Sequence, residues 1–284
     1  PFFAPFFVMF FGFCLGDAGY GLIFILAATF FKPRVKKQTK SALTMIQYFG
    51  IATIVFGLLT GTLFGIRLYE KAIFSSIEDL FITNQQLFDL SVIVGGFHII
   101  FGMCLKVFNR IKQKGFIYGV STMGWLLLAI SSVVFYLLLP ENTRPVLKPL
   151  YIGLVVLSGI MIIFFSKPEA NVFVNLGQGI WDIYTNVTGL LGDFLSYIRL
   201  FAIGISTAIL GFVFNQMAIS LSPDVPVIGQ LVFVIILVFG HSINIFMSSL
   251  GSLVHPMRLI FVEFYKNAGF TGGGKEYKPF TKVK

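Results

Sequence analysis

Charged residues are scarce in this chain. Lys, Arg, Asp and Glu make up 12% of its 284 residues, about half of the share found in a soluble domain. The two cysteines, Cys14 and Cys104, both lie in apolar stretches, which argues against a disulfide framework. The sequence also lacks a phosphate-binding loop, a Ser-His-Asp or Cys-His arrangement and paired carboxylates. We therefore expect no catalytic activity of the chain by itself, and neither a metal nor another cofactor.

Apolar residues take the place of the missing charges. Hydrophobic residues account for 56% of the chain, including 35 phenylalanines, and the mean hydropathy is +0.89. Such a composition excludes a disordered chain and predicts an all-α polytopic membrane protein in a lipid bilayer. Barrel strands would need alternating polarity, whereas these apolar runs are unbroken. The net charge of +9 does not indicate nucleic acid, because the basic residues lie between the apolar runs.

Six stretches have about the length and polarity of a membrane span. They are residues 42–66, 90–108, 116–139, 150–165, 198–221 and 227–253. Helical periodicity continues after the last of these to residue 268, which gives a helix of about 63 Å if it is unbroken. Such a helix must tilt steeply or project from the bilayer, and Pro256 is expected to kink it.

The first apolar stretch, residues 2–31, allows two interpretations. As one helix it would be about 45 Å long, too long for an upright span. Asp17 lies among glycines at its centre, which favours a turn between two short helices. The alternative is one long tilted helix with a buried aspartate. With the hairpin, the chain has about eight membrane helices.

We expect four parts along the chain. Residues 1–166 form six scaffold helices, and the less apolar residues 167–190 form an amphipathic helix at the interface. Residues 191–268 form two long tilted helices, and 269–284 form a cytoplasmic tail. Because the sequence begins at Pro1 without Met, we also expect a missing segment upstream.

The basic residues predict the orientation. Fifteen of the 21 lie at connections on one side of the expected spans or in the tail, and four lie on the other side. The positive-inside rule places the larger group, and both ends of the chain, in the cytoplasm of a multi-pass cell-membrane protein. The remaining two are Arg199 and Arg258.

Arg199 is the residue of greatest interest. If its helix starts near Val187, Arg199 lies about 18 Å along it, near the middle of a bilayer core of roughly 30 Å. An arginine there costs about 2.5–3.5 kcal/mol, so it normally faces water, a carboxylate or a moving partner. Small residues around it allow another helix to approach closely: Gly189, Gly192, Ser196, Ala202 and Ser206. The alternatives are ordinary helix packing and a structural ion pair with Asp193 or Asp17.

The last helix carries a polar stripe. Its members are spaced by three or four residues and so share one helix face: His241, Asn244, Ser248, Ser252, His255 and Arg258. A hydrophilic stripe through a membrane helix implies either water or a polar neighbour. Taken alone, Arg258 is also explained as a basic residue that reaches the cytoplasmic interface.

Three segments together resemble one family. They are residues 11–21 (FGFCLGDAGYG), 195–202 (LSYIRLFA) and 255–264 (HPMRLIFVEF), followed by a Gly-rich tail ending in KPF at 278–280. In this order they resemble the membrane half of the stator subunit of rotary V/A-type ATPases, called subunit a or subunit I. The short loops suggest a bacterial or archaeal member. The cytoplasmic N-terminal half of that family is absent from the chain.

The resemblance implies an ion-translocating role. The two last helices would face a ring of proteolipid rotor subunits, with Arg199 as the essential arginine and Arg258 as the second. The subunits of the peripheral stalk and the central-stalk cap would be further partners. Eukaryotic members carry a glutamate and a histidine where this chain has Ser248 and Thr207.

A mechanism follows from the resemblance. Each rotor carboxylate would ionise opposite Arg199 and exchange H⁺ or Na⁺ through two offset half-channels. Candidate lining residues are His241, Asn244, Ser248, Ser252, His255 and Glu263. The competing interpretations are a secondary transporter, which predicts internal repeats that are not evident, and a purely structural anchor, which leaves Arg199 unexplained.

Overall fold

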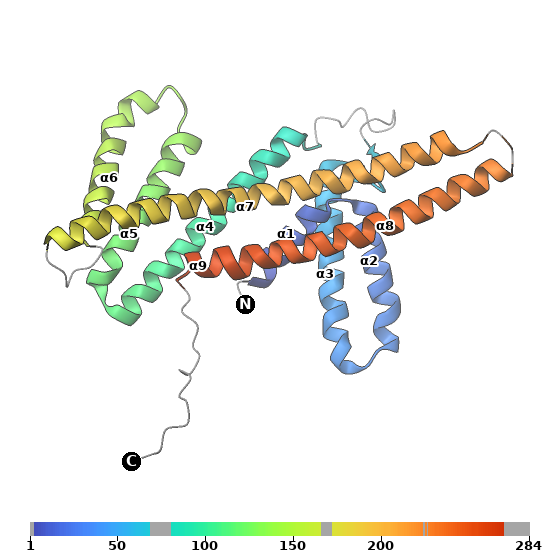
Figure 1. Ribbon diagram of the computed structural model, residues 1–284, viewed down its shortest axis with the longest axis horizontal. Helices are drawn as coiled ribbons and strands as arrows, with labels where there is room; N and C mark the ends of the chain where they lie inside the picture. Colours follow the sequence, from blue (N-terminus) through green and yellow to red (C-terminus); the bar gives the residue numbers. More distant parts are fainter. Residues whose placement is uncertain (1–2, 69–80, 166–171, 224, 226, 270–284) are drawn as a thin grey trace, which may run out of the picture. The chain divides into compact units, whose positions relative to one another are not determined.

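The computed structural model describes residues 3–68, 81–165, 172–223, 225 and 227–269 (Figure 1). The expected tail, 269–284, lies outside this part except for Gly269. The elements in chain order are α1 (Phe3–Leu15), α2 (Ala18–Phe31), η1 (Lys32–Arg34), α3 (Lys37–Thr60), β1 (Thr62–Leu63), β2 (Ile66–Arg67), α4 (Asn84–Lys114), α5 (Phe116–Val133), η4 (Val134–Leu138), α6 (Arg144–Phe164), α7 (Val172–Leu221), α8 (Ile228–Arg258), η5 (Leu259–Phe264) and α9 (Tyr265–Asn267).

Six helical segments are long and apolar enough to cross a membrane. They are Lys37–Thr60, Asn84–Gln113, Phe116–Tyr136, Arg144–Phe164, Val174–Leu221 and Ile228–Asn267. The all-α polytopic membrane fold is therefore confirmed. The eight expected helices correspond to α1–α8, but α1 and α2 have 13 and 14 residues and reach only about 20 Å each. Neither is long enough to cross a core of roughly 30 Å alone.

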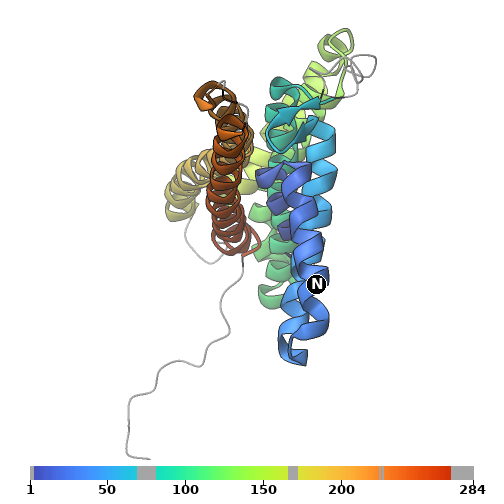
Figure 2. The same cartoon turned by 90° about the vertical axis from the view of Figure 1, so that its right-hand side faces the viewer.

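The break at Asp17 is confirmed, and the single long helix is wrong. In α1, Phe11 stacks on Phe49 of α3 and Phe13 meets Phe56, so α1 follows α3 in the same direction. In α2 the order is reversed: Ala18 lies against Gly57, and the later residue Gly21 faces the earlier residue Gly50. Figures 1 and 2 show α2 and α3 side by side. Gly16 makes the turn with φ of +48°, a conformation that glycine adopts without strain.

The helix of the apolar stretch 42–66 ends earlier than expected. Helix α3 stops at Thr60 because Gly61 takes a left-handed conformation, with φ of +66°. The following residues form a two-stranded hairpin in which Thr62 pairs with Arg67, so the predicted helical end at Ile66 is wrong. The hairpin packs beside the α1–α2 turn, as the hydrogen bonds of Asp17 described below show.

Other boundaries differ because helical hydrogen bonding continues beyond the apolar residues. Helices α4 and α6 each begin six residues before the apolar stretch that predicted them. A π-helical turn, η4, ends the segment that begins with α5, and another, η5, follows Pro256 in the segment that begins with α8. Residues 172–190 are not a separate helix but the start of α7, which runs unbroken for 50 residues. The interfacial position of residues 167–190 stays a prediction.

The chain divides into two compact units. The first contains Pro1–Gly96 and Leu190–Val262, and the second contains Phe97–Gly189 and Glu263–Lys284. In the first unit α1 and α2 pack on α3, and α1 also packs on α8. In the second, α5 packs on α6, and His98 stacks on Phe264 with ring centroids 4.5 Å apart. His98 is thus a packing residue.

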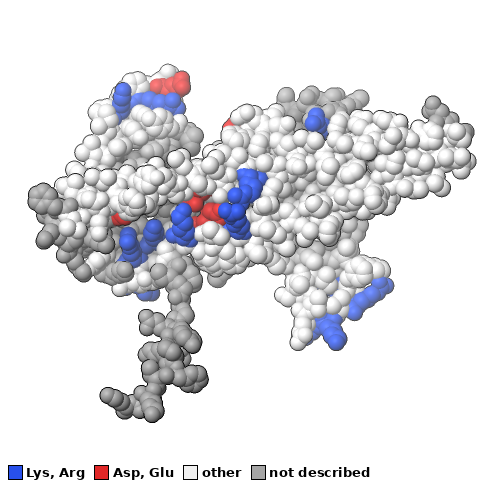
Figure 3. All heavy atoms as spheres, in the orientation of Figure 1, with Lys and Arg blue, Asp and Glu red and all other residues white. Residues whose placement is uncertain are grey.

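On the face shown in Figure 3, charged side chains are confined to a few places. Most of the visible face carries neither sign, as expected for helices that face lipid. In the first unit, Lys and Arg gather where α2 and α3 are connected: Lys32, Arg34, Lys36, Lys37 and Lys40. At the opposite end of α3 the described residues contain one base, Arg67. This asymmetry supports the predicted orientation of α3.

Candidate functional site

Arg199 lies near the middle of α7, about 40 Å from its start. The expected helix start near Val187 is wrong, because α7 begins at Val172. The adjoining residues Tyr197 and Leu200 are fully buried, whereas the Arg199 side chain is only partly covered. Its Nη1 is buried and has no hydrogen-bond partner in the described part of the chain. Arg199 therefore has an unused donor at the centre of a long apolar helix.

A structural ion pair does not explain Arg199. Within the described ranges no carboxylate lies within ion-pair distance of its guanidinium. The Asp17 carboxylate is engaged elsewhere: Oδ1 accepts from the backbone N–H groups of Gly19, Tyr20 and Phe64, and Oδ2 accepts from that of Gly65. Asp17 thus caps α2 and ties the α1–α2 turn to the β hairpin.

The second half of α7 runs antiparallel to α8. Asn244 Nδ2 donates to the Thr207 carbonyl over 3.1 Å, and a Cβ on Gly251 would lie 3.9 Å from Ile203. The same register brings His255 near Arg199, and His255 interacts electrostatically with both Arg199 and Arg258. The charges of Arg199 and Arg258 both reach His255, so this part of α7 and α8 favours an anionic partner.

The polar stripe of α8 lies on one helix face, as its spacing predicts. Asn244, Ser248 and Ser252 are buried, whereas Arg258 at the end of the stripe is exposed. Its first half finds polar neighbours inside the unit: His241 Nδ1 lies 2.7 Å from the Tyr20 hydroxyl, and Nε2 lies 3.0 Å from Asn215 Oδ1. Ser248 donates to Asn244 Oδ1 over 2.9 Å. Of the two explanations for the stripe, a polar neighbour therefore applies to His241, Asn244 and Ser248.

The second half of the stripe has a different environment. The Ser252 hydroxyl is buried and has no hydrogen-bond partner among the described residues. His255 is partly covered, and Arg258, the last residue of α8, is exposed. Glu263 is buried on η5 and belongs to the second unit.

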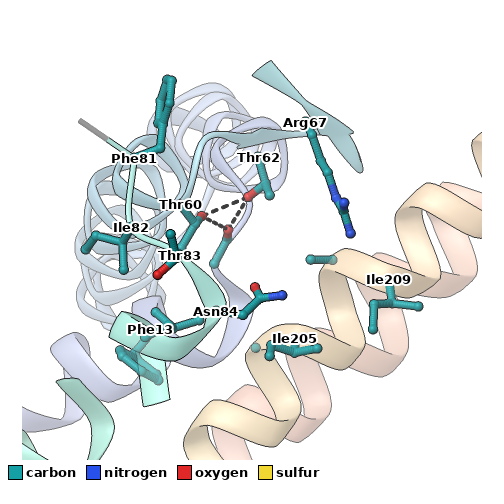
Figure 4. Close-up of a pocket in the computed structure, with 14 residues that line it drawn as sticks. Phe13, Thr60, Thr62, Arg67, Phe81, Ile82, Thr83, Asn84, Ile205 and Ile209 are labelled. Atoms are coloured by element: carbon teal, nitrogen blue, oxygen red, sulfur yellow. Dashed lines mark hydrogen bonds between the residues drawn. The ribbon is translucent and has the colours of Figure 1, made fainter. Parts of the chain in front are cut away.

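A cavity of about 300 Å³ opens beside α7 in the first unit (Figure 4). Its polar lining comes from the end of α3, the hairpin and the start of α4: Thr60, Thr62, Arg67, Thr83 and Asn84. The opposite wall is formed by α7 from Gly204 to Ile209. In Figure 4 the Arg67 side chain reaches from the hairpin toward α7, and its guanidinium lies 5.5 Å from the Phe212 ring centroid. The Thr60 and Thr62 hydroxyls both donate to the Gly16 carbonyl.

Sequence reasoning missed several of these polar residues. Tyr20, Asn215 and the residues around the cavity stand alone in apolar or short connecting segments, without a periodic partner. Tyr20 and His241 are 221 positions apart, and only the fold brings them into contact. The one local signal was the position of Tyr20 directly after the Asp17 turn.

Comparison with known proteins identifies relatives in bacteria and archaea. The V-type ATP synthase subunit I of Borreliella burgdorferi is 30% identical over 299 residues, which cover 99% of this chain and 49% of that protein. The A-type ATP synthase subunit I of Methanocaldococcus jannaschii is 29% identical, over 97% of this chain and 44% of that protein. The A-type ATP synthase subunit I of Pyrococcus horikoshii is 28% identical, over 95% of this chain and 41% of that protein. The chain thus spans about half the length of these relatives. No protein-family model matches the chain.

Proposed function

Because the chain is homologous along nearly its whole length to subunit I of V-type and A-type ATP synthases, we propose that it is the ion-translocating membrane part of such a subunit. It would act against a rotor ring of proteolipids and couple the passage of H⁺ or Na⁺ to rotation. ATP chemistry would belong to other subunits. The observation that carries the proposal is Arg199, whose Nη1 is buried without a partner near the middle of α7.

The electrostatics of Arg199 favour a moving anionic partner. An unsatisfied buried donor costs about 1–3 kcal/mol, and more when the group is charged. A carboxylate that reaches Arg199 would remove this cost by charge-assisted hydrogen bonds. The nearby cations also favour the ionised form of that carboxylate, so it releases its proton or sodium ion there. Once past Arg199, the carboxylate must bind an ion again before it re-enters lipid.

The exposed face of α7 is suited to contact a rotating ring. Leu195, Ala202, Ser206, Ile209 and Val213 are exposed and recur every three to seven residues. The small side chains of Ala202 and Ser206 allow a neighbouring helix to pass at short range. We assign this face to the rotor, which places the ring beside Arg199.

Two aqueous routes would lead to this face. The cavity lined by Thr60, Thr62 and Arg67 has room for several waters and lies on the side of the 61–83 connection, which the charge bias places outside. It supports a vestibule of the external half-channel. The unpartnered Ser252 hydroxyl and His255 support the cytoplasmic route, which leads past Arg258. Glu263 stays a predicted lining residue. Peripheral-stalk and central-stalk-cap subunits would complete the assembly.

Cross-linking tests the assignment of the rotor face. After Cys104→Ser, which removes the exposed native thiol, Ser206→Cys would be introduced into the assembled complex. We expect an oxidant to form a disulfide between Cys at position 206 and a cysteine placed on the outer, membrane-embedded face of the proteolipid. Val156→Cys is the matched control, because Val156 is also exposed, on α6, but lies in the other unit. Equal cross-linking at both positions, or none at 206, would contradict the proposal. A secondary transporter would not copurify with a ring at all.

A further inference from the structure

A single web of hydrogen bonds joins α2, α7, α8 and the β hairpin of the first unit. Its members on α8 are His241, Asn244 and Ser248, and its other side chains are Tyr20 and Asn215. The web ends on two backbone carbonyls, those of Thr207 and Phe64. Tyr20 and Asn244 are fully buried, so the web has no access to water at its centre.

The two carbonyls fix the direction of every hydrogen bond. A carbonyl can only accept, so Asn244 must turn its Nδ2 toward Thr207, and the same nitrogen donates to the Tyr20 hydroxyl over 2.8 Å. The single Tyr20 proton is then directed to His241 Nδ1, 2.7 Å away. At the other end, Asn215 must turn its Nδ2 toward the Phe64 carbonyl, over 2.8 Å, which leaves Oδ1 facing His241 Nε2.

His241 is thereby assigned one protonation state from two independent sides. Its Nδ1 must accept from Tyr20, and its Nε2 must donate to Asn215. Only the neutral tautomer with the proton on Nε2 satisfies both. An imidazolium would leave the Tyr20 proton without an acceptor within the web. Among the described residues, the charged group that acts electrostatically on His241 is Asp17, which already accepts four backbone hydrogen bonds.

We propose that His241, held as the neutral Nε2–H tautomer by Tyr20 and Asn215, is a positioning residue for ion translocation rather than a channel-lining group. The web cannot relay protons, because it passes through two amides and ends on a carbonyl. It instead pins α8 to α7 and to the Asp17 turn. This inference rests on the proposed function, since what it positions is the Arg199 site.

The hydrogen bonds that hold α8 against α7 affect Arg199 through the register of the two helices. Thr207 lies eight residues from Arg199, about 12 Å along α7. Because α8 is attached to α7 at Asn244, its later residue His255 is held within electrostatic range of Arg199. Without these hydrogen bonds, α8 can slide or rotate against α7 when the ring exerts torque, and the polar groups of α8 are no longer aligned with Arg199.

Nitrogen-15 NMR of histidine in the complete complex in lipid vesicles tests the tautomer. This chain contains three histidines, His98, His241 and His255. With the histidines of this subunit labelled, the signal that is lost in His241→Gln and kept in His98→Gln and His255→Gln is that of His241. We expect a neutral imidazole protonated on Nε2 at neutral pH. An imidazolium, or a proton on Nδ1, would overturn the inference. This measurement does not depend on transport.

Coupled transport tests the positioning role. Tyr20→Phe removes both hydrogen bonds of the Tyr20 hydroxyl, to His241 and from Asn244, and His241→Gln removes at least one of the two that His241 makes. Each should lower the number of ions carried per ATP by at least about fivefold, the shift that the loss of one hydrogen bond causes in a two-state equilibrium. Tyr151→Phe is the control, since it also loses a tyrosine hydroxyl, which contacts Ser132, but in the other unit. His241→Asn keeps an acceptor near the Nδ1 position and should lose less. If Tyr20→Phe and His241→Gln couple like the wild type while Arg199→Ala does not, the positioning role of His241 is wrong and the proposed function stands. If Arg199→Ala also couples normally, the proposed function fails.

Discussion

Replacing Arg199 separates its role in transport from any role in folding. In the wild-type protein, the Arg199 guanidinium forms no ion pair with a described carboxylate, and its Nη1 has no hydrogen-bond partner among the described residues. Arg199→Ala removes this charged group. No intramolecular hydrogen bond of Nη1 is lost, so the variant should keep its stability within about 1 kcal/mol and assemble with a full set of subunits. The loss of the Arg199 charge should therefore affect only the step in which the rotor carboxylate reaches this position.

The size of the transport defect follows from that encounter. A hydrogen bond between charged groups contributes about 1.5–3 kcal/mol, which corresponds to a loss of roughly 10- to 150-fold in the rate of the step that it assists. We expect ATP-driven ion uptake to fall by at least this factor in Arg199→Ala. Arg199→Lys should also nearly fail, because lysine lacks the planar fork and can lose its proton when desolvated.

The assay is ion uptake by vesicles that contain the reconstituted complex, with subunit content measured on the same preparation. Arg144→Ala is the control, since that arginine is paired with the exposed Glu141 at the start of α6, in the other unit. Surface pairs contribute little, so its uptake should be unchanged. If Arg199→Ala vesicles with all subunits still build a gradient, the charge at Arg199 is not required and the reasoning is refuted.

Three further predictions concern the frame around the site. Asp17→Ala removes four hydrogen bonds to a buried carboxylate and should cost about 3–5 kcal/mol, whereas Asp17→Asn keeps an oxygen that can accept three of them and should cost about 1–2 kcal/mol; thermal unfolding of the purified complex in detergent would show whether this order is reversed. Arg258→Ala should reduce uptake less than Arg199→Ala because Arg258 is exposed at the end of α8; wild-type uptake would make it an interfacial residue without a role in transport. Single cysteines at Gln38 and Gln113 should be labelled from the cytoplasm and one at Asn142 from outside, and cytoplasmic labelling of position 142 alone would contradict the charge-based topology.

The sequence by itself determined the number and type of the helices. Lipid cannot satisfy backbone groups, so each apolar run must form a helix, and hydropathy locates it. The same constraint made Asp17 among glycines readable as a break and Arg199 as a functional residue. The spacing of the α8 stripe also determined its shared face, because helical periodicity is a local property.

Tertiary structure decided what those residues face. The continuation of α7 through residue 190 and the end of α3 at Gly61 depend on backbone hydrogen bonds that continue or stop outside the apolar runs. The contact of His241 with Tyr20 joins residues 221 positions apart, and that of Asn215 with Phe64 joins residues 151 apart. No periodicity records such pairs, because each partner is isolated in its own segment. Whether a polar residue in a membrane helix meets water or another side chain is therefore settled only when the helices pack.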